Sequence, residues 1–142
     1  MVVRDDGIEA LRRCRLFKGL DSAGLARILA EADECVFLED HRVLTEGRLG
    51  AELFVIVSGF AEVLVDGERV AILEKGDFFG EMAVIDGGPR TATVRAITQV
   101  RCLSLPNGLA RRLVDGSPTV AANLVDALVE RLRQAATARS AA

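Results

Sequence analysis

The feature that most constrains the fold is a central stretch in which short apolar runs alternate with glycines. The runs are rich in Val, Ile, Leu and Phe and span residues 35–38, 42–46, 52–57, 60–65, 69–74, 91–97 and 100–105. Between or beside them lie Gly47, Gly50, Gly59, Gly67, Gly76, Gly80, Gly87 and Gly88. Short strands separated by turn residues predict a sandwich or barrel of β-strands. Asp66-Gly67 lies between two of the runs and predicts a hairpin turn.

Helical patterns flank this β region on both sides. Before it, Ile8, Leu11 and Cys14 recur at helical spacing within residues 7–17, and Asp21 or Ser22 can cap a second helix. After it, Pro106 suits the first turn of a short helix, and Ser117-Pro118 predicts the start of a longer one.

The long final helix is expected to carry one apolar stripe and a basic C-terminal half. The stripe consists of Ala121, Leu124, Val125, Leu128 and Leu132, and the basic residues are Arg131, Arg133 and Arg139. We therefore expect one domain over residues 1–142. Helices over about 7–33 and 106–138 would flank a β core over about 34–105.

Composition is consistent with one compact domain. The chain has 142 residues, of which 50% are hydrophobic, enough to bury a sizeable core. No apolar run approaches the roughly 20 residues that span a bilayer, and the N-terminus lacks a signal-peptide layout. These features predict a cytoplasmic protein without membrane insertion. The net charge of −3 argues against non-specific binding to nucleic acid.

The residue types that metalloenzymes need are scarce. The chain has one histidine, His41, and three cysteines, Cys14, Cys35 and Cys102, which form no CxxC pair and no disulfide framework. A metal enzyme of the cupin type would need several histidines and a carboxylate, and a phosphodiesterase would need clustered metal ligands. We therefore expect no enzyme activity, no metal and no cofactor.

One segment departs from the strand pattern and carries the chemistry. Residues 79–85 lie between two glycine turns and are long enough for one or two helical turns, with Glu81 near the start and Arg90 after the second turn. Free N–H groups and an arginine suit a phosphate, and a carboxylate suits a sugar hydroxyl. Together they describe a nucleotide pocket. The alternative is that Glu81 and Arg90 pair with each other and only staple the loop.

The sequence Phe79-Gly80-Glu81-Met82-Ala83, followed by Pro89-Arg90-Thr91-Ala92-Thr93-Val94, resembles the phosphate-binding cassette of cyclic-nucleotide-binding domains. Residues 16–20, 46–47, 53–59 and 76–79 and the Ser117-Pro118 helix also resemble the family, so the likeness covers about residues 8–135. It implies a mainly β fold, a β-roll or jelly roll (a double-stranded β-helix) with N-terminal helices and a long C-terminal helix. The cassette would lie at about residues 79–92.

The resemblance also implies which residues bind. Arg90 would bind the cyclic phosphate, helped by the backbone around Ala83, Thr91 and Ala92. Glu81 would take the ribose 2′-hydroxyl, helped by the backbone of Gly80 and Met82. Val63 and Leu73 would line the sugar and base pocket, and Arg131 would cap the base. The alternative for Arg131 is a surface arginine that only complements the helix dipole.

Two positions bear on the details of the resemblance. Thr91 follows the cassette arginine, where a hydroxyl favours cyclic GMP in some relatives, although others with Ser or Thr there bind cyclic AMP. Asp40 precedes the second strand where many relatives have glycine, and aspartate tolerates the left-handed conformation that such a turn needs.

The function that this resemblance implies is a sensor that binds a cyclic nucleotide, with cyclic AMP favoured over cyclic GMP, and that acts on a partner in trans. The final helix could dock on an effector protein or on a second copy. A transcription regulator of the catabolite-activator type is a further alternative, but no helix-turn-helix follows the final helix, so we expect no DNA binding. The remaining alternative is a degenerate β-roll scaffold that no longer binds nucleotide.

Overall fold

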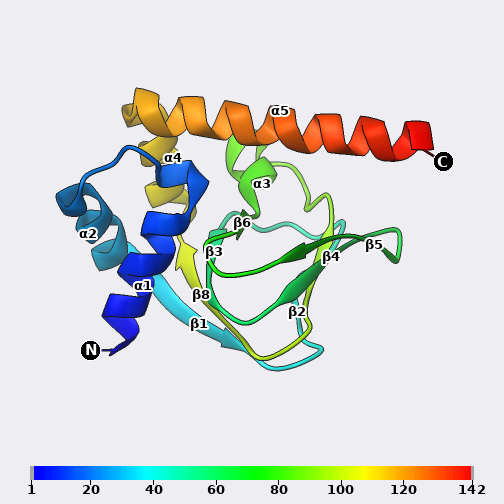
Figure 1. Ribbon diagram of the computed structural model, residues 1–142, viewed down its shortest axis with the longest axis horizontal. Helices are drawn as coiled ribbons and strands as arrows, with labels where there is room; N and C mark the ends of the chain where they lie inside the picture. Colours follow the sequence, from blue (N-terminus) through cyan, green and yellow to red (C-terminus); the bar gives the residue numbers. More distant parts are fainter. Residues whose placement is uncertain (1, 142) are drawn as a thin grey trace.

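The computed structural model describes the backbone of residues 2–141 and the side chains of residues 6–137. The described residues form two four-stranded antiparallel sheets that face each other as a jelly roll (Figure 1). The first sheet has the order β1-β8-β3-β6, with β1 Asp33–Phe37, β8 Val100–Leu105, β3 Leu53–Ser58 and β6 Phe78–Phe79. The second has the order β2-β7-β4-β5, with β2 Arg42–Leu44, β7 Thr93–Ala96, β4 Ala61–Val65 and β5 Glu68–Leu73. The expected β-roll is therefore confirmed.

Strand β3 separates two hydrophobic cores. Its residues Leu53 to Val57 are all buried, and they alternate between the cores because successive side chains of a strand point to opposite faces. Phe54 and Ile56 point into the roll, where they join a cluster that includes Leu73 and Cys102. Leu53, Val55 and Val57 point out of the roll and pack against the helices.

The helices cover the outer face of the first sheet. They are α1 Val2–Arg13, the 3-10 helix η1 Arg15–Phe17, α2 Ser22–Glu31, α4 Asn107–Gly116 and α5 Pro118–Ala141. The helix expected over residues 7–17 thus begins earlier and is split, because Cys14 has an extended backbone between α1 and η1.

The predicted helix starts are confirmed at two places and differ at a third. The Asp21 carboxylate accepts a hydrogen bond of 2.8 Å from Gly24 N, and the Ser117 hydroxyl accepts one of 3.2 Å from Val120 N. Pro118 occupies the first position of α5. Pro106, in contrast, precedes the first turn of α4 as its N-cap, and its carbonyl accepts from Ala110 N.

The strands match the predicted runs apart from their ends. The runs predicted over 42–46 and 91–97 are shorter as β2 and β7. The short strand β6 lies outside the predicted runs but within residues 76–79, whose likeness to the family implied a strand. The β4–β5 hairpin turns at Asp66-Gly67 as predicted, with φ of 52° and 81°. Asp40 has φ of 70°, so the left-handed turn before β2 is confirmed with aspartate in place of glycine.

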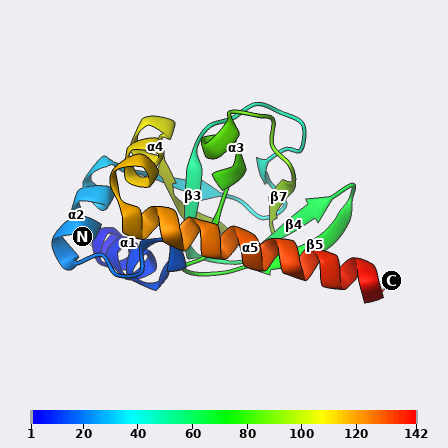
Figure 2. The ribbon, with the colours of Figure 1, turned by 90° about the horizontal axis from the view of Figure 1, so that it is seen from above.

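Helix α5 runs across the roll and passes beside α3 (Glu81–Asp86), as both ribbon views show (Figures 1 and 2). Its first half is tied to η1, because the Asn123 amide donates to the carbonyls of Leu16 and Lys18, and Glu130 pairs with Arg15.

The prediction of a single apolar stripe on α5 was wrong. Val120, Leu124 and Ala127 form the buried face, whereas Val125 and Leu132 are 58% and 72% exposed. The two sets both follow helical spacing, but each residue turns the helix by about 100°, so they occupy neighbouring faces. Arg139 lies outside the described side chains.

Candidate functional site

The candidate site is built around the short helix α3, Glu81–Asp86, which lies between two left-handed glycines, Gly80 at φ 92° and Gly87 at φ 68°. The helical turn expected over residues 79–85 is therefore present, shifted toward the C-terminus. Gly80 is required sterically as well, because a Cβ there would lie 2.7 Å from the carbonyl oxygen of Glu52. The backbone of Gly80 thus lies closer to the Glu52 carbonyl than the backbone of any residue with a Cβ could.

Arg90 is buried beside Gly80 and held by the backbone around it. Its Nη1 donates to the Gly80 carbonyl at 3.1 Å and its Nη2 to the Glu52 carbonyl at 3.1 Å. The Glu52 carboxylate is 3.4 Å from the same Nη2. Burial lowers the pKa of the Arg90 guanidinium, and the Glu52 carboxylate opposes this effect.

Glu81 is also buried, with 7% of its surface exposed, and it pairs with Arg131 of α5 through Oε1. The guanidinium of Arg131 donates to the Phe78 carbonyl at 2.8 Å and lies 4.5 Å above the centroid of the Phe78 ring. Burial lowers the pKa of Arg131, and nearby Asp77 opposes this effect. Arg131 therefore contacts Glu81 and Phe78 and is not a surface arginine that only complements the helix dipole.

Glu81 and Arg90 do not pair with each other. Each has its own partner in the described part of the chain, Arg131 for Glu81 and Glu52 for Arg90. The alternative, in which Glu81 and Arg90 form an ion pair that only holds the loop in place, is therefore wrong. Two buried side chains of opposite charge instead flank the start of α3 and are positioned independently.

The other predicted site residues occupy the surroundings in different ways. Ala83 is buried in α3, whereas Met82 is 40% exposed on the same helix. Thr91 and Ala92 precede β7 and are exposed and half-buried. Val63 of β4 and Leu73 of β5 both lie on the inner face of the roll, Leu73 within its core cluster and Val63 against it.

Sequence reasoning missed two residues that contact the predicted site residues, Glu52 and Phe78. Glu52 was assigned to the start of a strand, but β3 begins at Leu53 and leaves Glu52 free to meet Arg90 with both its carbonyl and its carboxylate. Phe78 belongs to the short strand β6 and supplies the ring and carbonyl that hold Arg131. The signal for Glu52 was weak, because a carboxylate before a strand has no periodicity to distinguish it.

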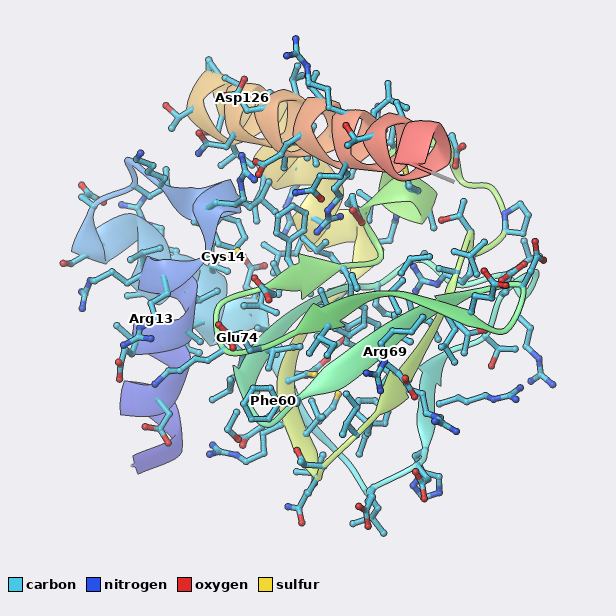
Figure 3. All side chains as sticks on the ribbon, turned by 45° about the vertical axis from the view of Figure 1, so that its right-hand side comes forward. Arg13, Cys14, Phe60, Arg69, Glu74 and Asp126 are labelled. Carbon is cyan, nitrogen blue, oxygen red and sulfur yellow. The ribbon has the colours of Figure 1, made fainter. Side chains whose placement is uncertain are left out.

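A surface cavity of about 390 Å³ lies elsewhere, between α1 and the turns that follow β3 and β5. Figure 3 shows three of its residues, Arg13, Phe60 and Glu74, on the α1 side of the roll. None of the predicted site residues lines it. Its two basic groups, Arg13 and Lys75, both pair with Glu9. The candidate site at α3 is therefore separate from this cavity.

The sequence profile described as "Cyclic nucleotide-binding domain" matches residues 34–117, from β1 to the end of α4. The chain belongs to the cyclic nucleotide-binding domain family. The match contains α3 and Arg90, so the family assignment and the local geometry concern the same segment.

Three relatives illustrate the family. The chain is 30% identical over 131 residues to a CRP-like cAMP-activated global transcriptional regulator of Mycobacterium tuberculosis, covering 89% of this chain and 58% of that protein. The structure of the Thermus thermophilus catabolite activator protein superposes with a TM-score of 0.79 at 28% identity, covering 89% of this chain and 62% of that one. The N-terminal domain of a Streptomyces coelicolor transcriptional regulator superposes with a TM-score of 0.70 at 32% identity, covering 92% and 94% of the two chains.

No group of three or more His, Cys, Asp or Glu side chains among the described residues is arranged to hold a metal ion. No helix in that part of the chain is long and apolar enough to cross a membrane.

Proposed function

We propose that the chain is a cyclic-nucleotide sensor of the cytoplasm that binds cyclic AMP in preference to cyclic GMP and regulates a partner in trans. The observation that carries this proposal is the pair Glu81 and Arg90, buried on either side of Gly80 and each held by a separate partner. A buried cation and a buried carboxylate that do not neutralise each other suit a ligand with one anionic group and one hydroxyl donor.

Arg90 is suited to the phosphate because its position is fixed while some of its donors are unused. The carbonyls of Gly80 and Glu52 engage Nη1 and Nη2, whereas Nε has no hydrogen-bond partner among the described residues. A guanidinium has five N–H donors in a rigid plane, so an arginine held at one side can still bind an anion at the other.

Glu81 is suited to the ribose for a similar reason. Arg131 engages Oε1, and Oε2 forms no hydrogen bond or ion pair with the residues that the structure describes. We infer that Oε2 accepts the ribose 2′-hydroxyl while Arg131 orients the carboxylate. In this arrangement the helix α5 senses the ligand through Glu81, and base capping by Arg131 remains a prediction.

Cyclic AMP is favoured because the Mycobacterium tuberculosis relative is described as cAMP-activated. Thr91 does not exclude cyclic GMP, since it is exposed beside Arg90. The chain spans 58% of that relative's length, and the rest of the relative's activity is not carried over.

The partner surface that we propose is the exposed apolar face of α5, made of Val125, Val129 and Leu132, which are 58%, 43% and 72% exposed. Arg131 lies beside Leu132 on the same helix, so a ligand that changes the Glu81 contact would also change the position of this face. The partner is an effector protein or a second copy, and the oligomeric state in solution separates the two.

The test is isothermal titration calorimetry with cyclic AMP, cyclic GMP and, as a control, 5′-AMP. We expect saturable binding with cyclic AMP tighter than cyclic GMP and 5′-AMP much weaker than both. Equal or reversed affinities of the two cyclic nucleotides would refute the base preference alone. No heat and no thermal stabilisation with either would refute the sensor and favour the degenerate scaffold.

The partner surface is tested separately by light scattering of the native protein and of Leu132→Glu, each with and without cyclic AMP. If the partner is a second copy, the native protein should be a dimer. Leu132→Glu should dissociate this dimer and leave ligand binding unchanged. A monomer in all four samples would rule out the second copy and leave the effector protein.

A further inference from the structure

Cys35 and Cys102, which are far apart in the sequence, lie directly opposite each other on the neighbouring antiparallel strands β1 and β8. Residues that are directly opposite project from the same face of a sheet. In such pairs the Cα atoms are about 4.5 or 5.5 Å apart, within the range of about 4.4–6.8 Å that a disulfide spans. Both residues are free thiols.

The two thiols differ in their access to solvent. Cys102 is 0% exposed in the core of the roll, where Ile56 of β3 lies on its other side. Cys35 is half-buried on β1, which is the edge strand of its sheet and pairs with β8 alone. An edge strand opens more readily than a central strand because it has one hydrogen-bonded neighbour. Cys35 is therefore the thiol that meets an oxidant first.

We propose that Cys35 and Cys102 form a redox modification site, in which hydrogen peroxide converts the two thiols into a reversible disulfide that links β1 to β8. In the first step the Cys35 thiolate attacks a peroxide oxygen, the O–O bond breaks, and Cys35 becomes a sulfenic acid as hydroxide leaves. In the second step the Cys102 sulfur attacks the Cys35 sulfur, the S–O bond breaks, and water leaves with the Cys102 proton. In total two thiols are oxidised to one disulfide and one hydrogen peroxide is reduced to two water molecules.

The surroundings make this reaction slow at neutral pH. Burial raises the pKa of Cys102 to about 12, which excludes it as the first nucleophile. The pKa of Cys35 is raised as well, by burial first and then by the carboxylates of Asp33, Glu52 and Glu34. The site should therefore respond to sustained oxidation rather than to a brief pulse.

Cys14 provides a matched control within the same chain. It is buried at 1% exposure in the core formed with the helices, outside the paired strands β1 and β8. A reagent that oxidised cysteines without selectivity would also oxidise Cys14. The proposed reaction instead leaves Cys14 as the one remaining free thiol.

The experiment treats the native chain, Cys35→Ala, Cys102→Ala and Cys14→Ala with hydrogen peroxide, and then measures intact mass, free thiols and Tm before and after a dithiol reductant. We expect the native chain and Cys14→Ala to lose two hydrogens and two thiols and to recover both on reduction. The Tm of the oxidised form should be higher by roughly 5–15 °C, because the disulfide closes a long loop in the unfolded chain. Cys35→Ala and Cys102→Ala should show none of these changes.

Three results would overturn the proposal: all thiols remaining free after prolonged treatment, a gain of oxygen without loss of hydrogen, or a covalent dimer between chains. Cys35 is half-buried, so Cys35→Ala should fold even if Cys102→Ala does not. The Cys35→Ala variant alone is therefore enough to test whether the disulfide forms. The outcome does not depend on the proposed nucleotide, because neither cysteine belongs to the site at α3.

Discussion

The carboxylate of Glu81, the first residue of α3, is paired with the guanidinium of Arg131 on α5. Arg131 also binds the carbonyl and the ring of Phe78, which lies two residues before Gly80, the N-cap of α3. One side chain of the final helix thus contacts both the candidate ribose carboxylate and the strand that leads to it. This arrangement connects the site to the helix that carries the proposed partner surface.

Arg131→Ala should weaken cyclic AMP binding, because Glu81 loses the charged partner that orients it. The loss should be only about threefold to tenfold, because Arg131 is itself partly exposed. Hydrogen exchange in the C-terminal half of α5 should also become faster, since the contacts to Glu81 and Phe78 are lost. Arg133→Ala is the matched control, because Arg133 is exposed on the same helix. Equal affinity and exchange in both variants would exclude the orienting role.

Replacing Arg90→Ala should weaken cyclic AMP binding well over tenfold, since removing a charged partner from a buried phosphate costs roughly 2–5 kcal/mol. Glu81→Ala should weaken binding as well, through the ribose hydroxyl. Calorimetry measures both. Arg112→Ala is the control, because Arg112 is an exposed arginine paired with Glu31 away from α3. If Arg90→Ala and Glu81→Ala both bind like the native chain, the site assignment is wrong.

The two glycines that flank α3 should respond differently to alanine. Both have a left-handed backbone, which costs roughly 1–2 kcal/mol for an L-residue. A Cβ at Gly87 meets nothing within 4 Å, whereas one at Gly80 would lie 2.7 Å from the Glu52 carbonyl. Gly87→Ala should therefore lower the free energy of unfolding by about 1 kcal/mol, measured by urea denaturation. Gly80→Ala should lower it further and also weaken nucleotide binding, and equal effects would contradict the close approach at Gly80.

Glu62 on β4 should make stability depend on acid pH. It is 3% exposed on the outer face of the second sheet and binds Arg69, labelled in Figure 3, and Arg95. Hydrogen bonds from Arg69 and then Arg95 lower the pKa of the Glu62 carboxyl below its ordinary value. A lowered pKa in the folded state means that the stabilisation is present above the unfolded pKa of about 4.3 and is lost as the pH falls through the folded value.

We therefore expect the difference in Tm between the native chain and Glu62→Gln to be largest near pH 6 and to shrink toward pH 3. Thermal melts across this range measure it. Glu68→Gln, at an exposed position of β5, is the control and should show a small difference at every pH. A Tm difference for Glu62→Gln that stays constant with pH would show that its charge does not contribute.

Sequence reasoning was most successful where the signal is local. The turn at Asp66-Gly67, the caps at Asp21 and Ser117 and the left-handed Asp40 each depend on a few adjacent residues, and the structure confirms them. It was less successful at the ends of strands and on α5. Val125 and Leu132 fit an apolar helical stripe, but they lie on the exposed face. The reason is that the packing of α5 against the rest of the protein fixes which side of the helix is buried.

By itself, the sequence determined the alternation of short strands and glycine turns, the helix starts and the segment that carries Glu81 and Arg90, because propensities and steric limits act over a few neighbouring residues. Only the tertiary structure decided that Glu81 meets Arg131, that Arg90 meets Glu52 and that Cys35 lies opposite Cys102. These pairs join residues that are distant along the chain. Their contacts depend on strand register and on the docking of α5, which are set by the packing of the whole core rather than by any local pattern.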